Sequence, residues 1–324
     1  MTPFQEIRRR LTPGLECLND MIAAELRSGN TLMDKVIDGY LARRGKQLRP
    51  MLVMLTAELF GHEGANVMEA AASVEILHNA SLIHDDVVDD SDRRHGQATI
   101  NAVWTNHIAV LVGDFFVSTS LQLALRTGDM RVIGVIGSLG RLLSIGEMDQ
   151  IYNAREHTLT EEAYFEVISH KTASLFEACV EMGCYCSGVD DDRLDRLRRF
   201  ARLLGLCFQI KDDIFDYYDA SGLGKPTGND LREGKITLPL IHALTGSGHP
   251  KAEEMLAVSR HEPITEQDIT TLLDFAKEAG GIAYARETLL RLHDEAVGIL
   301  GTFPESSARN DLRTLIDYVI DRDI

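Results

Sequence analysis

Two clusters of aspartate with the same spacing are the residues of this sequence best suited to chemistry. Each has the pattern Asp-Asp-x-x-Asp, and each ends an apolar run, rich in alanine or leucine, with the periodicity of a helix. In a helix, positions i, i+1 and i+4 span an arc of about 100°, so the three carboxylates of a cluster should share one face. The first cluster consists of Asp85, Asp86 and Asp89, and the second of Asp212, Asp213 and Asp216.

Carboxylates crowded on one helix face repel one another, by about 4 kcal/mol for two unit charges 4 Å apart at an effective dielectric constant of 20. A chain can keep such clusters if they are fully solvated or if they bind cations. Hard oxygen ligands suit Mg²⁺, which typically takes one or two carboxylates together with substrate phosphates. One cluster alone would be typical of a solvated helix end. Two copies, each followed by a basic loop that contains glycine, favour metal binding.

The composition indicates a helical protein that does not bind nucleic acid. Hydrophobic residues make up 44% of the 324 residues and aromatic residues only 6%, while Leu, Ala, Glu and Arg dominate, which favours helix. The net charge of −17 provides no basic field for nucleic acid. An anionic substrate would therefore need metal ions and locally placed Lys and Arg side chains.

The cysteines and the N-terminus predict a soluble cytoplasmic protein. The sequence has five cysteines and no Cys-x-x-Cys pair, which is typical of reduced thiols in the cytosol. The first residues lack an apolar signal region. No apolar run reaches the roughly 18 residues of a transmembrane segment, because Asp114 interrupts the run over residues 108–117.

Helical periodicity covers almost the whole chain, and no segment convincingly predicts a strand. No low-complexity linker divides the sequence, so we expect one all-α domain over residues 1–324. Polar loops are expected at residues 91–99 and 220–234. Helices are predicted over residues 14–28, 31–44, 50–60, 65–90, 100–127, 129–147, 160–187, 190–219, 235–245, 264–279, 281–300 and 305–322.

Three segments place cations where phosphate groups could bind. Lys46 and Arg49 lie between two helices, although this segment alone is more typical of a solvated connector. Residues 92–96 follow the first cluster, where arginines could simply neutralise a helix end. Residues 224–239 follow the second cluster, and a loop of this kind could close over a substrate and exclude water. His78 lies two helical turns before the first cluster and is either part of the same site or an ordinary core histidine.

Together these motifs resemble those of the trans-prenyl diphosphate synthases, also called polyprenyl synthetases, and especially the long-chain bacterial type that makes octaprenyl diphosphate. The resemblance covers about residues 30–320 in family order. It implies an all-α bundle of many helices around a central cavity, as in isoprenoid synthases, and a homodimer. The matching segments are residues 45–50, 82–89, 113–114, 171–172, 208–216, 224–226 and 233–239.

The resemblance also implies roles for individual residues. About two or three Mg²⁺ ions per active site would hold the allylic diphosphate. The ions would be held by Asp85, Asp89 and Asp212. Asp86, Asp213 and Asp216 would either ligate the ions as well or support these ligands. Contacts to the allylic substrate would come from Arg94, Lys171, Thr172, Gln209, Lys225 and Lys235. Contacts to isopentenyl diphosphate would come from Lys46, Arg49 and His78. The residues expected to be catalytic are Asp85, Asp86, Asp89, Lys171, Asp212, Asp213 and Lys225.

One position departs from the family pattern. A second arginine is expected after Arg94, and this sequence has His95 there. Either Arg93, one position before Arg94, replaces the missing arginine, or His95 binds isopentenyl diphosphate when it is protonated.

The residues and the resemblance agree on the reaction. Metal ions would neutralise a leaving diphosphate, the allylic C–O bond would ionise, and the double bond of isopentenyl diphosphate would attack the cation before a proton is lost. The starter would be farnesyl or geranylgeranyl diphosphate. No Ser/His/Asp or Cys/His nucleophile is convincingly arranged.

Product length should depend on the steric room beneath the first cluster. Ala80 and Ser81, about one turn before it, are small, and in this family bulky residues nearby stop growth early. The roughly 20 residues back to Ala65 span ~30 Å, enough for about five or six isoprene units. We therefore expect a product of C30 to C50, centred on octaprenyl, for the side chain of a quinone.

Three other interpretations make different predictions. A terpene cyclase-like enzyme would turn over without isopentenyl diphosphate and would lack the segment at residues 45–50. A non-catalytic subunit of a heteromeric synthase would typically have lost one aspartate cluster. A generic acidic helical scaffold would show no Mg²⁺-dependent binding of diphosphate.

Overall fold

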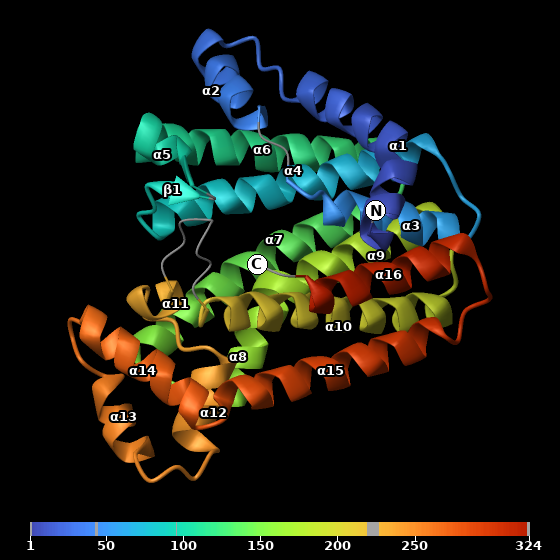
Figure 1. Ribbon diagram of the computed structural model, residues 1–324. Coiled ribbons are helices and arrows are strands. Elements are labelled where there is room, and N and C mark those ends of the chain that lie inside the picture. The colour runs from blue at the N-terminus through green and yellow to red at the C-terminus, as the bar shows by residue number, and fades with distance from the viewer. Residues whose placement is uncertain (1, 43–44, 95, 219–226, 323–324) are drawn as a thin grey trace. The chain divides into compact units, whose positions relative to one another are not determined.

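The computed structural model describes residues 2–42, 45–94, 96–218 and 227–322, and these are mainly helical (Figure 1). The predicted all-α class is confirmed. The chain divides into two compact units, which we describe separately, and the expectation of a single domain stays a prediction. Unit 1 comprises residues 1–141, 175–201 and 299–315, and unit 2 comprises residues 142–174, 202–298 and 316–324.

Unit 1 carries the first aspartate cluster, at the end of a long helix. It contains α1 (Pro3–Glu25), α2 (Thr31–Leu41), α3 (Leu48–Leu59), α4 (Ala65–Val88), β1 (Arg93–Arg94), β2 (Gln97–Ala98), α5 (Ile100–Val103) and α6 (Asn106–Arg126). Five helices contribute residues to both units: α7 (Met130–Arg155), α9 (Ser174–Cys186), α10 (Asp191–Phe215), α15 (Gly281–Leu300) and α16 (Ser307–Asp321).

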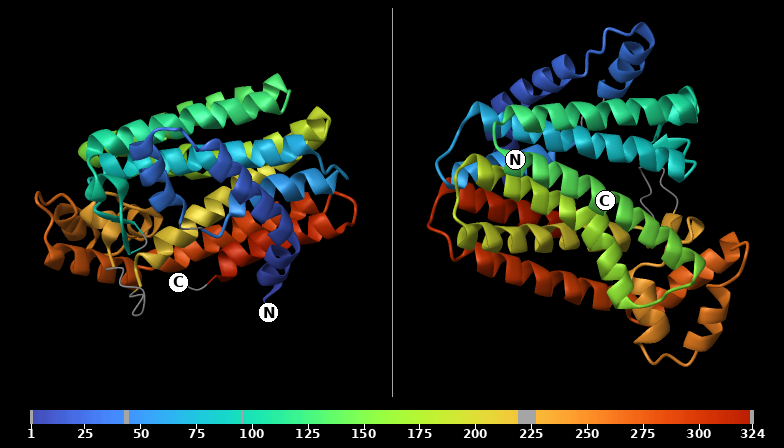
Figure 2. Two further views of the ribbon diagram at one scale, coloured as in Figure 1. Left: turned by 90° about the horizontal axis from the view of Figure 1, so that it is seen from above. Right: turned by 180° about the vertical axis from the view of Figure 1, so that it is seen from behind.

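Small side chains let α4 and α6 pack closely, and the two helices lie side by side in Figures 1 and 2. The buried Ser73 hydroxyl donates to the carbonyl oxygen of Ser120 at 2.8 Å. An added Cβ on Gly113 would lie 2.2 Å from Nε2 of His84, so the imidazole occupies the space that glycine leaves. His84, next to the first cluster, therefore has a packing role between these helices.

Unit 2 carries the second cluster at the end of α10. Its other elements are α8 (Glu161–Ile168), the π-helical turn η1 (Ser169–Ala173), α11 (Asn229–Arg232), α12 (Leu238–Thr245), α13 (Ala252–Val258) and α14 (Glu266–Glu278). Helix α12 packs against α8, α13 and α14, and its Leu240 and Ile241 are buried together with Leu272 of α14.

Several element boundaries differ from the prediction for local reasons. Helix α1 begins at Pro3 and not at residue 14, because Thr2 and Gln5 form a capping box, and it continues through Pro13. The helix predicted over residues 100–127 is interrupted before Thr105, whose hydroxyl caps α6 by accepting from the amide of Ile108 at 3.2 Å. The prediction missed α13 and the two-residue ladder of β1 and β2.

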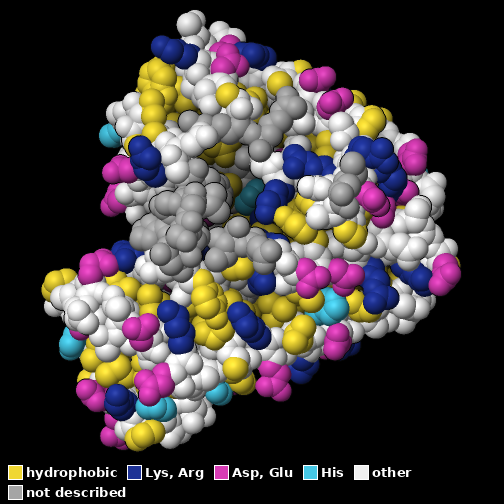
Figure 3. Space-filling model, in the orientation of Figure 1, with side chains coloured by type: hydrophobic (Ala, Val, Ile, Leu, Met, Phe, Trp, Pro, Cys, Tyr) yellow, Lys and Arg dark blue, Asp and Glu magenta, His cyan; other side chains and the backbone are white. Residues whose placement is uncertain are grey.

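Helix α6 is long and apolar enough, by length and composition alone, to span a membrane. The sequence did not predict such a helix, because Asp114 interrupts its apolar run. In the structure, 44% of its most apolar window is buried. Acidic and basic side chains are interspersed over the face of the molecule in Figure 3.

A glycine at the contact between α9 and α3 gives a test of this packing. An added Cβ on Gly183 would lie 2.8 Å from both the Thr56 Cβ and the Val53 carbonyl oxygen, so backbone must move. We expect Gly183→Ala to lower the free energy of unfolding by about 1–3 kcal/mol in urea denaturation. Gly137→Ala is the matched control, because that exposed helical glycine has open space and should gain roughly 0.5–1 kcal/mol. Equal stability of Gly183→Ala and the parent would contradict this packing.

Candidate active site

The first aspartate cluster lies at the carbonyl end of α4. Asp85 and Asp86 belong to its last turn, Asp89 is the C-cap, and Asp90 ends the helix with a φ of 48°. This end of a helix carries a partial negative charge, so carboxylates placed here gain from nearby cations. The cluster therefore favours cation binding through its position as well as its composition.

Within this cluster, Asp86 differs from its neighbours because it is buried. It is 5% exposed, and its Oδ1 accepts from Nε of Arg94 at 2.7 Å. Arg94, predicted to contact the substrate, reaches Asp86 from β1. Asp85 and Asp89 are partly exposed. The structure thus gives the middle aspartate a structural partner and leaves the outer two nearer to solvent.

The basic segment before α3 has a defined backbone. Gln47 adopts a left-handed conformation with a φ of 55°, and its side-chain amide donates to Oδ1 of Asn19 at 2.8 Å. The flanking Lys46 is exposed, and the guanidinium carbon of Arg49 lies 5.6 Å from the ring centroid of Phe176. The described part of this segment is therefore an ordered turn, and the roles of Lys46 and Arg49 stay predictions.

Two buried titratable groups lie near Arg49. Burial lowers the pKa of His78 well below its ordinary value, and the positive charges of Arg49 and Arg94 lower it further. Burial raises the pKa of Glu75, against the effect of Arg49. His78 is thus a neutral imidazole at pH 7. The prediction missed Glu75, because a single glutamate in a helical run carries no motif.

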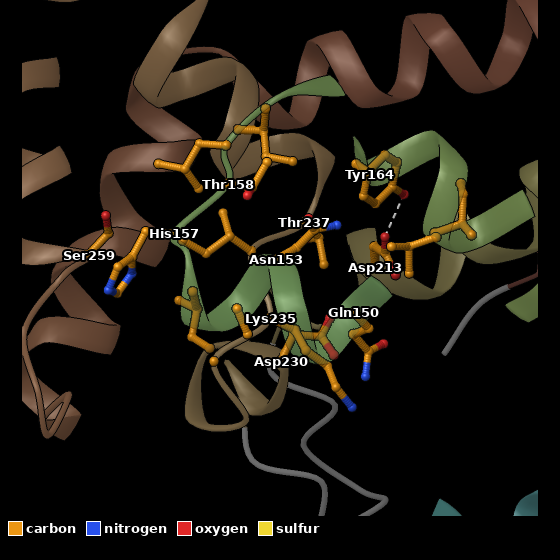
Figure 4. A pocket seen from close by; sticks show the side chains of 18 of the residues that line it. Gln150, Asn153, His157, Thr158, Tyr164, Asp213, Asp230, Lys235, Thr237 and Ser259 are labelled. Atoms are coloured by element: carbon orange, nitrogen blue, oxygen red, sulfur yellow. Dashed lines mark hydrogen bonds between the residues drawn. The ribbon is translucent and has the colours of Figure 1, made fainter. Parts of the chain in front are cut away.

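The second cluster likewise has a buried middle aspartate and two partly exposed outer ones. Asp213 is 3% exposed, and its Oδ2 accepts from the Tyr164 hydroxyl at 2.6 Å (Figure 4). Its Oδ1 accepts from Nε2 of Gln209 at 2.8 Å. The Thr172 hydroxyl donates to Oε1 of Gln209 at 2.7 Å. Burial raises the pKa of Asp213, opposed by these hydrogen bonds and reinforced by the negative charge of Asp212. Thr172 and Gln209, predicted to contact the substrate, thus also hold Asp213.

Asp216, the last member of this cluster, holds the backbone at residues 229–230. Its two carboxylate oxygens accept from the backbone amides of Asn229 at 3.0 Å and Asp230 at 3.1 Å. The backbone amide of Lys235 in turn donates to the carbonyl oxygen of Asp230 at 2.7 Å. Asp216 therefore fixes the path of the chain toward Lys235.

Lys171 lies in η1, where the helix is wider by one residue per turn. Such π-helical turns often occur at functional sites. Gly146 makes this possible, because an added Cβ would lie 2.8 Å from Cγ of Lys171 and 3.1 Å from its backbone nitrogen. The ammonium forms an ion pair with Glu147 and donates to Oε1 of Gln150 at 3.0 Å. The structure thus holds Lys171 in one position within unit 2.

A cavity of about 380 Å³ in unit 2 brings these groups together. In Figure 4, Asp213 and Tyr164 lie on one side of it, and His157 and Ser259 lie at the far end. Asp230, which the prediction missed, also lines the cavity, and burial raises the pKa of its carboxyl group. Five residues that the prediction placed in the site share its lining: Lys171, Thr172, Gln209, Asp213 and Lys235.

The carboxylates fit a metal ion that relies on its substrate for ligands. In the described part of the chain, no three His, Cys, Asp or Glu side chains are grouped so that they could hold a metal ion. Asp86, Asp213 and Asp216 are engaged by protein donors. A cation that takes one or two carboxylates and completes its shell with phosphate oxygens and water, as Mg²⁺ does, suits such a set of residues.

Two predicted site residues, His95 and Lys225, lie outside the described residues. Of the remaining predicted residues, Arg93 is exposed and donates from Nη1 to the carbonyl oxygen of Gly96 at 3.2 Å. The prediction also missed Tyr164 and Glu147. Of these two residues, only Glu147 has a signal in the sequence, because the adjacent Gly146 indicates a close approach between helices.

Comparisons with known proteins agree with this chemistry. The profile of the family described as Polyprenyl synthetase matches residues 30–275. The chain is 34% identical to octaprenyl diphosphate synthase of Escherichia coli, over 99% of both chains. Its fold is similar to a decaprenyl diphosphate synthase from Rhodobacter capsulatus, with a TM-score of 0.91, 32% identity and 98% of both chains covered. It is also similar to a polyprenyl synthase from Caulobacter crescentus complexed with calcium and isoprenyl diphosphate, with a TM-score of 0.89, 31% identity and 98% of both chains covered.

These matches extend over the segments that carry both aspartate clusters and the basic residues beside them. The chain therefore belongs to the polyprenyl synthetase family and is a trans-prenyltransferase of the long-chain bacterial type.

Proposed function

We propose that this enzyme condenses an allylic diphosphate, farnesyl or geranylgeranyl, with successive molecules of isopentenyl diphosphate. The product would be an all-trans polyprenyl diphosphate of C30 to C50, centred on octaprenyl, made in the cytoplasm for the side chain of a quinone. The names of similar proteins, octaprenyl and decaprenyl diphosphate synthase, support this range.

The observation that carries the proposal is the hydrogen-bonded network around Asp213. It joins the second cluster to Thr172 and Gln209 beside a cavity that Lys171 and Lys235 also line. Buried networks of this kind hold their members in place before a substrate arrives. A diphosphate bound there would meet two lysines and carboxylates able to hold a bridging metal.

In this proposal, Asp85, Asp89 and Asp212 would hold Mg²⁺, and the bound metal would supply positive charge for the leaving diphosphate. Lys171 and Lys235 bind phosphate oxygens as point charges once they exchange their partners Glu147 and Glu233 for substrate. The buried partners of Asp86 and Asp213 keep the neighbouring carboxylates oriented, so that little reorganisation is needed during the reaction.

The second substrate, isopentenyl diphosphate, would bind at the ordered segment before α3. Lys46 and Arg49 provide its positive charge, and Arg49 offers the planar fork that suits a phosphate. His78 contributes a neutral hydrogen-bonding group, because its pKa is well below 7. The released diphosphate would accept the proton that is lost.

The direct test is incubation of the purified chain with farnesyl diphosphate, labelled isopentenyl diphosphate and Mg²⁺, followed by product sizing. We expect prenyl products longer than the starter and their loss when EDTA removes the metal, because no protein cation alone neutralises the leaving group. Consumption of farnesyl diphosphate without isopentenyl diphosphate would instead favour a terpene cyclase. An inactive chain would favour a non-catalytic subunit.

Product length would be set beside Ala80 and Ser81 on α4. Ala80 is buried, and Ser81 is partly exposed and donates from its hydroxyl to the carbonyl oxygen of His78 at 2.8 Å. Small residues on α4 also serve the close packing against α6, as at Ser73. The two explanations differ in what a large residue should do: shorten the product, or destabilise the fold.

We expect Ala80→Tyr to shorten the main product to farnesyl or geranylgeranyl length, because the ring would block the path of the growing chain. Ser81→Tyr, at the less buried neighbour, is the second variant if Ala80→Tyr fails to fold. The measurement is product sizing together with the melting temperature of each variant. A folded variant with unchanged product length would contradict the steric explanation.

A homodimer is the expected assembly, and the outer face of α6 is the surface proposed for it. Leu111 and Leu125 are 60% and 61% exposed, and Val110 and Leu121 are each 40% exposed. Contiguous apolar exposure of this kind is typical of an interface. We expect the double variant Leu111→Glu, Leu125→Glu to sediment as a monomer, with Gln267→Glu at an exposed position of α14 as control. A parent chain that sediments as a monomer would contradict the dimer.

A further inference from the structure

Arg322, the last described residue, lies against the second aspartate cluster. It follows directly after α16, and its Nη2 is 2.7 Å from Oδ1 of Asp212. The arginine side chain is 9% exposed and the aspartate side chain 40% exposed. The nearly buried guanidinium of Arg322 therefore lies beside the partly exposed carboxylate of Asp212.

The position of Arg322 does not depend on Asp212 alone. Its guanidinium carbon lies 4.2 Å from the ring centroid of Phe208 and 5.5 Å from that of Phe215. Its Nη2 also donates to the carbonyl oxygen of Phe208 at 3.0 Å, and its Nε donates to that of Val319 at 3.2 Å. The rings and the two carbonyl groups fix the guanidinium plane, so the arginine acts as a rigid donor.

A second contact joins the same two segments. Nζ of Lys211 donates to the carbonyl oxygen of Ile320 at 2.7 Å and lies 5.0 Å from the ring centroid of Phe215. A cation at the carbonyl end of a helix is favourable, because it interacts with the helix dipole. Lys211 and the adjacent Asp212 thus both contact the chain where α16 ends, at Ile320 and Arg322 respectively.

We propose that Arg322 is a positioning residue for Asp212, and that it holds one carboxylate oxygen so that the group keeps a fixed orientation toward a divalent cation. This inference rests on the proposed function. Carboxylates that ligate metals are commonly held by a hydrogen bond from a neighbouring group, and losing that group typically weakens metal binding by roughly 10- to 100-fold. The aromatic rings and the carbonyl groups hold the guanidinium independently of Asp212, so its position beside the carboxylate does not depend on that ion pair.

The test measures Mg²⁺-dependent binding of an unreactive thio analogue of farnesyl diphosphate by calorimetry, with the full-length chain. We expect Arg322→Gln to raise the Mg²⁺ concentration for half-maximal binding roughly 10- to 100-fold. Arg322→Lys, which keeps the charge but loses the planar fork, should fall between Arg322→Gln and the parent. Arg291→Gln, at an exposed arginine of α15, is the matched control and should leave the midpoint unchanged.

A second measurement separates positioning from general damage to the fold. The KM for isopentenyl diphosphate at saturating Mg²⁺ should stay at the parent value in Arg322→Gln, and excess Mg²⁺ should restore its turnover. An unchanged Mg²⁺ midpoint, or equal weakening of both substrates, would overturn the inference. If Arg322→Gln does not fold, Arg322→Lys decides by the same two readouts. A parent chain that binds no analogue in Mg²⁺ would instead overturn the proposed function.

Discussion

Repulsion between like charges at the end of a helix is the constraint on which this structure depends. Both aspartate clusters lie at carbonyl ends, on α4 and on α10, where the helix dipole adds to the repulsion. Each cluster responds by burying its middle aspartate against fixed donors. Asp86 receives Arg94, and Asp213 receives Tyr164 and Gln209. Each cluster thus leaves an oxygen-rich, negatively charged helix end of the kind that suits a divalent cation.

The need to stabilise crowded carboxylates explains why so many of the polar residues contact one another. Arg322 and Lys171 occupy fixed positions next to carboxylates, and the backbone amides of residues 229–230 hold Asp216. Each contact reduces the freedom of a group that a diphosphate would otherwise have to order, and preorganised charge is the main source of catalysis in reactions of this kind. The π-helical turn at Lys171 and the small Gly146 are the local features that this positioning requires.

The sequence sufficed to predict what is repetitive or locally encoded. The periodicity predicted the all-α class, and the doubled aspartate pattern predicted the ends of α4 and α10. It could not predict partners that come from distant, unpatterned positions, such as Tyr164 for Asp213 or Arg322 for Asp212, because a single tyrosine or arginine in a helical run gives no signal. The capping box of Thr2 and Gln5 is a local signal for the start of α1 at Pro3, and the predicted start at residue 14 overlooks it.

The claim that the substrate completes the metal site can be measured directly by titrating the purified chain with Mn²⁺ and counting bound ions by electron paramagnetic resonance. The account predicts weak binding of Mn²⁺ alone, because the described residues group no three metal-binding side chains together. It predicts about two or three tightly bound ions once inorganic diphosphate is present. Tight binding without diphosphate, or no increase when it is added, would contradict the account.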